Sequence, residues 1–247
     1  MIDDYNNYHF DTKDYIVVIG LSCMISLGVA YLFYKSLVAA LFLLPSFFII
    51  SNKYKRRKVK LRKEQLTVQF KDAIQSISSA LEAGYSIENA VKFALNDLKL
   101  MYEAKSYINI ELQRILAMIA NSTPIEDAIE DFAQRSKLED IICFSEVFQS
   151  AKRSGGDLVY IIKHTSRIIS EKIEVSHAIE TLITAKKLEV TIMKSMPFAI
   201  LGYLMICSDG FLDPLYGNMF GKILMTIVLV VTVGLSFIAD QIMNIEV

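Results

Sequence analysis

Cysteine is scarce in this chain, and what the chain lacks excludes several kinds of protein. Three cysteines occur among 247 residues, and Cys23, Cys143 and Cys207 form no CxxC pair. They are too few and too scattered for a disulfide framework, so we expect small apolar side chains in a reducing compartment. A glycine-rich phosphate loop of the P-loop pattern is also missing, so the chain is not expected to hydrolyse nucleotide itself.

Charged side chains are missing from long stretches, although 21% of the residues are charged. Residues 16–34 carry none over roughly 19 positions, close to the ~20 that an α-helix needs to cross the hydrocarbon of a bilayer. Shorter or interrupted apolar runs follow at 36–51, 195–212 and 223–239. Lys35, between the first two runs, can extend its ammonium group to the interface. We therefore predict about four transmembrane helices, one pair near each end.

Acidic residues dominate the N-terminus. Asp3, Asp4, Asp11 and Asp14 stand against Lys13 alone. This is the wrong sign for the basic leader of a secretory signal peptide, so we expect the first apolar run to be retained as a membrane span.

A run of eight cations in eleven residues follows the second apolar run and contains no acidic residue. By the positive-inside rule this side of the membrane is cytoplasmic. The loop 208–221 carries Asp209 and Asp213 without a cation, so we expect it outside and both termini in the cytoplasm. Anionic lipid attracts such cations at ~1 kcal/mol each, whereas the lack of interleaved aromatics other than Tyr54 disfavours nucleic acid. The eight membrane-surface candidates are Lys53, Lys55, Arg56, Arg57, Lys58, Lys60, Arg62 and Lys63.

Between the two apolar pairs, residues 64–190 contain one proline and few glycines, and these glycines fall where helices should break. A stripe of apolar residues at helical spacing stops at Gly84, which suits the left-handed conformation after a helix. Ser86 then offers an N-cap for a helix over 87–100, and a third helix is predicted over 106–120. Together with three further helices they would make a six-helix, all-α cytoplasmic bundle.

The fourth helix of this bundle has the best local signal. Thr123 as N-cap, Pro124 at the first helical position and Glu126 three residues after the cap predict a capping box. The helix is expected to carry Ile125, Ala128, Ile129 and Phe132 inward and to end near 136.

The fifth helix is predicted over 139–153, with Ile142, Val147, Phe148 and Ala151 inward. Two glycines after it mark its end. The sixth is expected to begin at Leu158 behind a capping Asp157 and to run to 185 or further into the third apolar run, because 157–185 contains neither proline nor glycine. Pro197 interrupts regularity only inside that run.

The predicted organisation has five parts. They are a cytoplasmic N-terminal segment at 1–14, a transmembrane pair at 15–51, a basic juxtamembrane segment at 52–63, the helical bundle at 64–190 and a C-terminal transmembrane pair at 191–247.

Metal and catalytic sites are not predicted. Glu174 and His177 have the Glu-x-x-His spacing of di-iron bundles, but such a site needs a second copy, and neither His9 nor His164 follows a glutamate at that spacing. We expect no metal, no cofactor and no enzyme activity, and interpret residues 171–180 as a solvated helix face.

Two stretches of the chain have similar sequences. Residues 83–91 and 121–129, 38 positions apart, both read as a turn and a cap followed by Ile-Glu-(Asn/Asp)-Ala-(Val/Ile). Two interpretations stay open, a duplicated unit and the ordinary appearance of a capped amphipathic helix.

The order of these motifs resembles the type II secretion F domain, the platform-protein family of type II secretion systems and of type IV or Tad pili. Among its subfamilies the chain looks most like TadB, since it has a single bundle with an N-terminal span pair. Ser122-Thr123 and Lys186-Lys187 depart from the usual pattern. The residues that carry the resemblance are Leu81 to Ile87 with Ala90, Pro124 to Ile129, Ser154 to Leu158, and Leu182 to Ala185 ahead of Pro197.

The resemblance implies a non-enzymatic platform in the plasma membrane. Such a platform sits over a hexameric cytoplasmic secretion ATPase, passes its motion to pilin subunits lifted from the bilayer, and works with a second platform protein of the same family. Homo- or hetero-oligomers are implied, and Gly20, Gly28 and Gly202 are small enough for helix association in the bilayer.

The turns of the bundle supply the candidate partner-interaction residues. Their glycines have an alternative interpretation as helix stops that need only positive φ. The candidates are Gly84, Glu88, Asp127, Gly155, Gly156 and Asp157.

A second class of function stays open, namely an unrelated multi-span transporter or membrane enzyme with the bundle as a regulatory appendage. Polar residues that face one another within the spans would favour it. Lys194, Asp209 and Asp240 lie at the edges of the apolar runs, which favours the platform.

Overall fold

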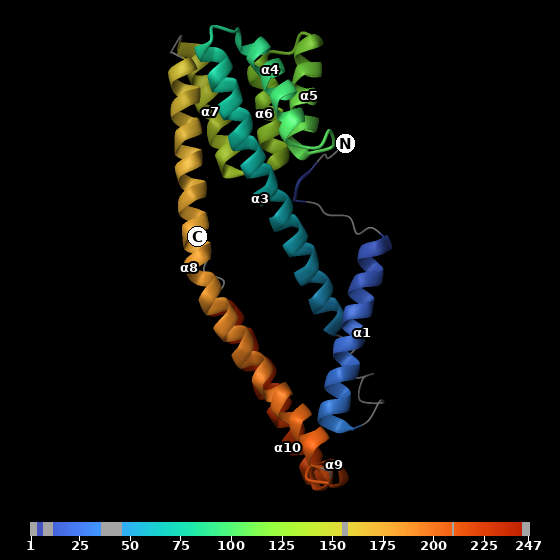
Figure 1. The fold of residues 1–247 in the computed structure, drawn as a ribbon. Helices are drawn as coiled ribbons and strands as arrows, with labels where there is room; N and C mark the ends of the chain where they lie inside the picture. Colours follow the sequence, from blue (N-terminus) through green and yellow to red (C-terminus); the bar gives the residue numbers. More distant parts are fainter. Residues whose placement is uncertain (1–3, 7–11, 36–45, 155–157, 209, 244–247) are drawn as a thin grey trace. The chain divides into compact units, whose positions relative to one another are not determined.

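The computed structural model describes residues 4–6, 12–35, 46–154, 158–208 and 210–243, and every regular element in these ranges is a helix (Figure 1). The predicted all-α class is thereby confirmed. The helices are α1 (Thr12–Tyr34), α3 (Ser46–Glu82), α4 (Ile87–Met101), α5 (Tyr107–Ala120), α6 (Ile125–Ser136), α7 (Glu139–Ser154), α8 (Leu158–Cys207), α9 (Asp213–Gly217) and α10 (Met219–Met243).

The chain divides into two compact units. The helical unit comprises Met1–His9 and Lys55–Val175, and the apolar unit comprises Phe10–Tyr54 and Ser176–Val247. Helices α3 and α8 each contribute residues to both units. The basic residues predicted as a separate juxtamembrane segment belong to α3, which is already helical at Ser46.

The helical unit is held by one hydrophobic core to which α3, α4, α5, α6, α7 and α8 contribute. On α4 the buried residues recur at Ala90, Val91, Ala94, Leu95 and Leu98, as the apolar periodicity predicts. Phenylalanines fill the centre of this core. The ring of Phe70 meets those of Phe132 and Phe144 edge to face, with centroids 5.9 and 5.5 Å apart, a favoured geometry for aromatic pairs.

The turn after α3 forms as predicted. Gly84 has φ +87°, and the N–H groups of Gly84 and Tyr85 donate to the carbonyls of Leu81 and Ala80. This is a Schellman motif, which satisfies carbonyls left unpaired at a helix end. Ser86 follows as the N-cap of α4, and its side chain accepts from the N–H of Asn89 at 3.5 Å.

The capping box predicted for α6 does not form, and that prediction is wrong. The N-cap is Pro124, and it makes no side-chain cap hydrogen bond. Ser122 takes the left-handed conformation at φ +64°, and the N–H of Thr123 donates to the carbonyl of Met118 at 3.0 Å. Thr123 is therefore part of the Schellman motif that closes α5 and lies one residue too early to cap α6.

The inward face predicted for α7 is partly wrong. Ile142 and Val147 are each 38% exposed, whereas Phe148 and Ala151 are buried as predicted. Ile141 and Phe144 are buried instead. Ile141, Phe144, Phe148 and Ala151 recur at three- and four-residue intervals, which keeps all four on one helix face.

The apolar unit contains long helices whose outer faces are not covered by protein. Within the described residues, three helices are long and apolar enough to cross a membrane, over Asp14–Tyr34, in Leu158–Cys207 and over Met219–Ala239. They indicate a membrane protein. Most of the second predicted run, at 36–45, lies outside the described residues. Pro197 lies inside α8 without ending it.

A small cluster joins three helices of the apolar unit. Phe33 of α1 is buried with Met225 and Leu229 of α10, and its ring meets that of Phe198 of α8 at 5.9 Å. Tyr34 shares a hydrogen bond of 2.8 Å with Thr226. These contacts pack α1, α8 and α10 against one another within the unit.

Replacing a central phenylalanine of the helical unit should be costly. Phe148 is 1% exposed and contacts the aromatic cluster, so Phe148→Ala should lower the free energy of unfolding by about 3–5 kcal/mol. Phe93→Ala is the matched control, because Phe93 is 44% exposed. Thermal unfolding of the purified chain in detergent, followed by circular dichroism, measures both. Equally small shifts in the unfolding temperature of the two variants would contradict a core centred on Phe148.

Candidate functional site

Alternate turns of the helical unit lie at one of its ends (Figure 1). The α3–α4 and α5–α6 turns, the end of α7 and the start of α8 all lie there. Two ion pairs join these elements, Lys152 to Glu126 at 2.5 Å and Lys163 to Glu82 at 2.8 Å. We call this region the turn end, defined by residues 82–88, 121–127, 151–154 and 158–163.

The turn end contains three of the predicted partner-interaction residues. Glu88 and Asp127 are exposed, and each lies in the first turn of its helix, where a carboxylate stabilises the N-terminal end of the helix dipole. Gly84 has open space where a Cβ would be, so only its positive φ requires glycine. Gly155, Gly156 and Asp157 lie outside the described residues.

The neighbouring carboxylate of Glu126 is engaged rather than free. Lys152 donates a hydrogen bond to it, which lowers the pKa of Glu126 below its usual value. The pair links α6 to α7 at the turn end. The structure thus separates two adjacent carboxylates, one paired across helices at Glu126 and one exposed at Asp127.

The predicted membrane-surface cations lie along the first half of α3. Lys53, Arg56, Arg57 and Lys60 are exposed at intervals that place them on one helix face. This face carries a row of positive charge along the part of α3 in which the chain passes from the apolar unit, at Tyr54, to the helical unit. Lys55 and Lys58 are half-buried.

Two of the eight cations turn toward the helical unit instead. The Arg62 guanidinium lies 5.9 Å from the centre of the Tyr107 ring, and Lys63 Nζ donates to the carbonyl of Lys137 at 3.3 Å. Burial lowers the pKa of Lys63. These contacts join the middle of α3 to α5 and to the turn after α6.

A buried polar cluster, which was not predicted from the sequence, lies beside these contacts. Glu111 of α5 is 1% exposed and accepts two hydrogen bonds from Arg135 of α6, at 2.8 and 2.6 Å. Arg135 Nε donates to Asp131 at 2.8 Å, and Arg114 lies 3.3 Å from the same carboxylate. Such two-pronged pairing satisfies charges that burial would otherwise penalise.

The N-terminus completes this cluster. The side chain of Tyr5 is fully buried and its hydroxyl donates to Glu111 Oε1 at 2.8 Å. Burial, followed by the charge of Glu111, raises the pKa of Tyr5 well above its usual value, so the phenol stays protonated. Burial opposes the charge of Arg135, yet its hydrogen bonds to Glu111 raise its pKa.

A weak signal for half of this cluster is present in the sequence. Glu111 lies on the same face of α5 as Ile108, Leu112 and Ile115, all of which are buried. A carboxylate in an apolar stripe needs a buried partner. For Tyr5 there is no such signal, because it lies 106 positions from Glu111.

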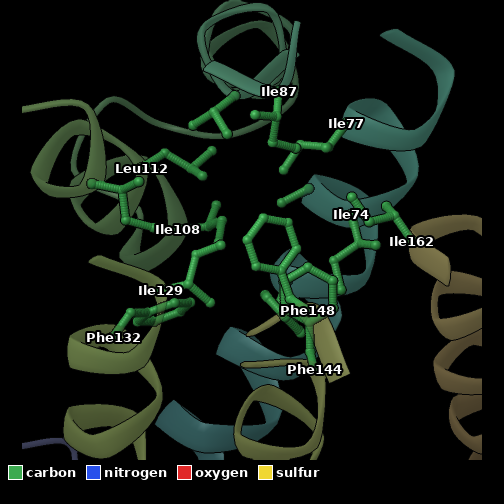
Figure 2. A pocket seen from close by; sticks show the side chains of 14 residues that line it. Ile74, Ile77, Ile87, Ile108, Leu112, Ile129, Phe132, Phe144, Phe148 and Ile162 are labelled. Carbon is green, nitrogen blue, oxygen red and sulfur yellow. The ribbon is translucent and has the colours of Figure 1, made fainter. Parts of the chain in front are cut away.

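The core also contains a small cavity, of about 30 Å³ (Figure 2). Its lining is entirely aliphatic or phenylalanine, including Ile74, Ile108, Phe144 and Phe148. Such a space stays dry and offers no group for acid–base chemistry or metal binding. Among the described residues, no group of three or more His, Cys, Asp and Glu side chains is placed to hold a metal ion, and Glu174 and His177 are both exposed on α8.

Comparison of the chain with models of known protein families, with curated proteins and with solved structures gives no match.

Breaking the buried ion pair should destabilise the helical unit. Arg135→Met leaves the Glu111 carboxylate buried without its cationic partner, and the free energy of unfolding should fall by about 3–5 kcal/mol. The control is Arg167→Met, which breaks an exposed pair with Glu171 whose side chains are 79% and 59% exposed and should cost about 1 kcal/mol or less. Denaturant unfolding in detergent compares them.

The double variant Glu111→Gln with Arg135→Met tests the cause. Removing both charges should restore part of the lost stability, because the cost arises from an unpaired buried charge. If the double variant is as unstable as the sum of the single variants, that explanation fails.

Proposed function

We propose that this chain is a membrane platform protein of a Tad or type IV pilus, or of a type II secretion-like machine, and that it couples a cytoplasmic secretion ATPase to the extraction and assembly of pilin subunits. The observation that carries the proposal is a helical unit that presents exposed carboxylates at its turn end and continues through α3 and α8 into apolar helices.

The turn end suits contact with a cytoplasmic partner. From Lys55 to Glu82, α3 rises by about 40 Å at 1.5 Å per residue. Glu88 and Asp127, which lie at the turn end, are therefore far along the helical unit from Lys55, where α3 enters it. An ATPase surface with cations would be drawn to them, and a second platform protein is the alternative occupant of the same end.

Helix α8 is the proposed path for force. It runs as one helix of 50 residues from Leu158 to Cys207. Up to Pro197, which has no N–H to donate, the ladder of backbone hydrogen bonds in α8 resists bending, whereas a loop between the bundle and the span would absorb a displacement. A push on the turn end would then reach the apolar part of α8, beside which pilin subunits leave the bilayer.

The finer proposal for the fold is a cytoplasmic six-helix bundle with four spans, in the plasma membrane. Docking of Asp4 and Tyr5 on the helical unit supports it. If the N-terminus and the helical unit share one side, the chain must cross the membrane an even number of times between them. Helix α1 supplies one crossing, so a second is required before Lys55. The basic face of α3 favours the cytoplasmic side with anionic lipid.

Charge reversal at the turn end tests the proposed ATPase contact. The double variant Glu88→Lys with Asp127→Lys should lower co-purification of the secretion ATPase roughly ten-fold and abolish surface pili, because repulsion replaces attraction. Glu146→Lys is the control, since Glu146 is exposed in the middle of α7. A deletion strain that still assembles pili would refute the function itself, and normal co-purification in the double variant would refute only this surface.

Cysteine labelling tests the topology. In a chain with Cys23→Ser and Cys207→Ser, the exposed Cys143 and an introduced Asn6→Cys should both react with a membrane-impermeant maleimide in inside-out vesicles. Asn218→Cys, between α9 and α10, should react only from the opposite side. Labelling of positions 6 and 143 from different sides would contradict the even number of crossings.

A further inference from the structure

The N-terminal contact on the helical unit has the features of a bound peptide. Asp4 and Tyr5 belong to the helical unit, although the chain enters α1 of the apolar unit only at Thr12. Within the described part of the N-terminus, the tyrosine is buried and Asn6 is exposed. Two consecutive residues thus make the contacts.

The socket for the tyrosine is built from α5 and α6. The Tyr107 ring meets the Tyr5 ring edge to face, with centroids 6.0 Å apart. Glu111 accepts from the phenol at 2.8 Å. The backbone N–H of Tyr5 donates to the carbonyl of Arg135 at 3.2 Å. A phenol is selected over a phenyl group, because phenylalanine would leave one bond of the Glu111 carboxylate unmade.

A second subsite receives the preceding carboxylate. Lys137 Nζ donates to Asp4 Oδ2 at 2.7 Å, and this contact lowers the pKa of Asp4. The other oxygen of Asp4 accepts from the N–H of Asn6 at 2.8 Å, which shapes the segment as a tight turn. Lys137 itself has φ +52° and its carbonyl is held by Lys63.

The groups that receive the tyrosine are also held by contacts inside the helical unit. Both oxygens of Glu111 are fixed by Arg135, and Arg135 is fixed by Asp131. The remaining contacts of Lys137 and Lys63 are also made within the unit. A site whose charged groups are already oriented loses little entropy when its ligand binds.

We propose that α5, α6 and the turn after α6 form a binding socket for a peptide in which a carboxylate directly precedes a tyrosine, and that residues 4 and 5 of this chain are its detachable occupant. Docking holds residues 4 and 5 on the helical unit, and release makes the socket available to another peptide of the same chemistry. The inference does not depend on the proposed role in pilus assembly.

The test empties the socket and refills it. The full chain carrying Tyr5→Ala, purified in detergent, is titrated with a fluorescent peptide of residues 1–9, and binding is followed by anisotropy. The variant should bind the peptide saturably. The unmodified chain should bind it at least about ten-fold more weakly, because its own segment competes at the high effective concentration of a tethered ligand.

Altered peptides test the chemistry of the socket. Tyr5→Phe in the peptide should weaken binding about 10- to 100-fold, the effect of a lost hydrogen bond to a buried charged group. Asp4→Asn should weaken it by up to about five-fold, because the pair with Lys137 is partly exposed. Asn6→Ala is the matched control and should change binding less than two-fold, roughly the scatter of an exposed position.

Several results would overturn the proposal. They are no saturable binding to a folded Tyr5→Ala chain, equal binding by the unmodified chain, and equal binding of the Tyr5→Phe and natural peptides. Failure of the Tyr5→Ala chain to fold, judged by its thermal unfolding curve, would also overturn it, since the tyrosine would then be a permanent part of the core and not a detachable ligand.

Discussion

Burial of apolar surface is the constraint on which the rest of this structure depends, and the chain meets it in two ways. In the helical unit, apolar stripes of α3 to α8 cover one another, and the charged pair of Glu111 and Arg135 is buried beside them. In the apolar unit, side chains such as Ile206 and Phe220 remain 82% and 78% exposed. A protein with such a surface requires a lipid or protein environment, because water does not tolerate an apolar face of this extent.

The ends of helices could be predicted from the sequence where a capping residue suited only one position in the turn. Gly84 and Ser86 end α3 and start α4 as predicted, because a left-handed residue and an N-cap are local requirements. At Thr123 the same reasoning failed, since two local roles competed for one residue. The similarity between 83–86 and 121–124 indicates the correct N-cap of α6. Both stretches fold as a Schellman motif followed at once by the next N-cap, which is Ser86 in the first and Pro124 in the second.

Tertiary features were less accessible from the sequence. Ile141 and Ile142 are equally apolar neighbours, and only tertiary packing decides that Ile141 joins the hydrophobic core while Ile142 stays exposed. The pairing of Glu111 with Arg135 joins two helices, and that of Tyr5 with Glu111 joins positions 106 apart. Sequence periodicity predicts which face of a helix is apolar, but it does not say which charged residue of another helix will neutralise a carboxylate on that face.

The cations of α3 include some whose role was predicted from the sequence and some whose role depends on tertiary contacts. Positive charge beside an apolar run predicts a membrane surface, and Lys53, Arg56, Arg57 and Lys60 retain the exposure that this role requires. Arg62 and Lys63, two and three positions after Lys60, instead contact Tyr107 and Lys137. These are the same residues that receive Tyr5 and Asp4. Along α3, the cations therefore pass from attraction to lipid on one face to support of the N-terminal segment on another within about one turn. A change in the charge of this short stretch would act on both at once.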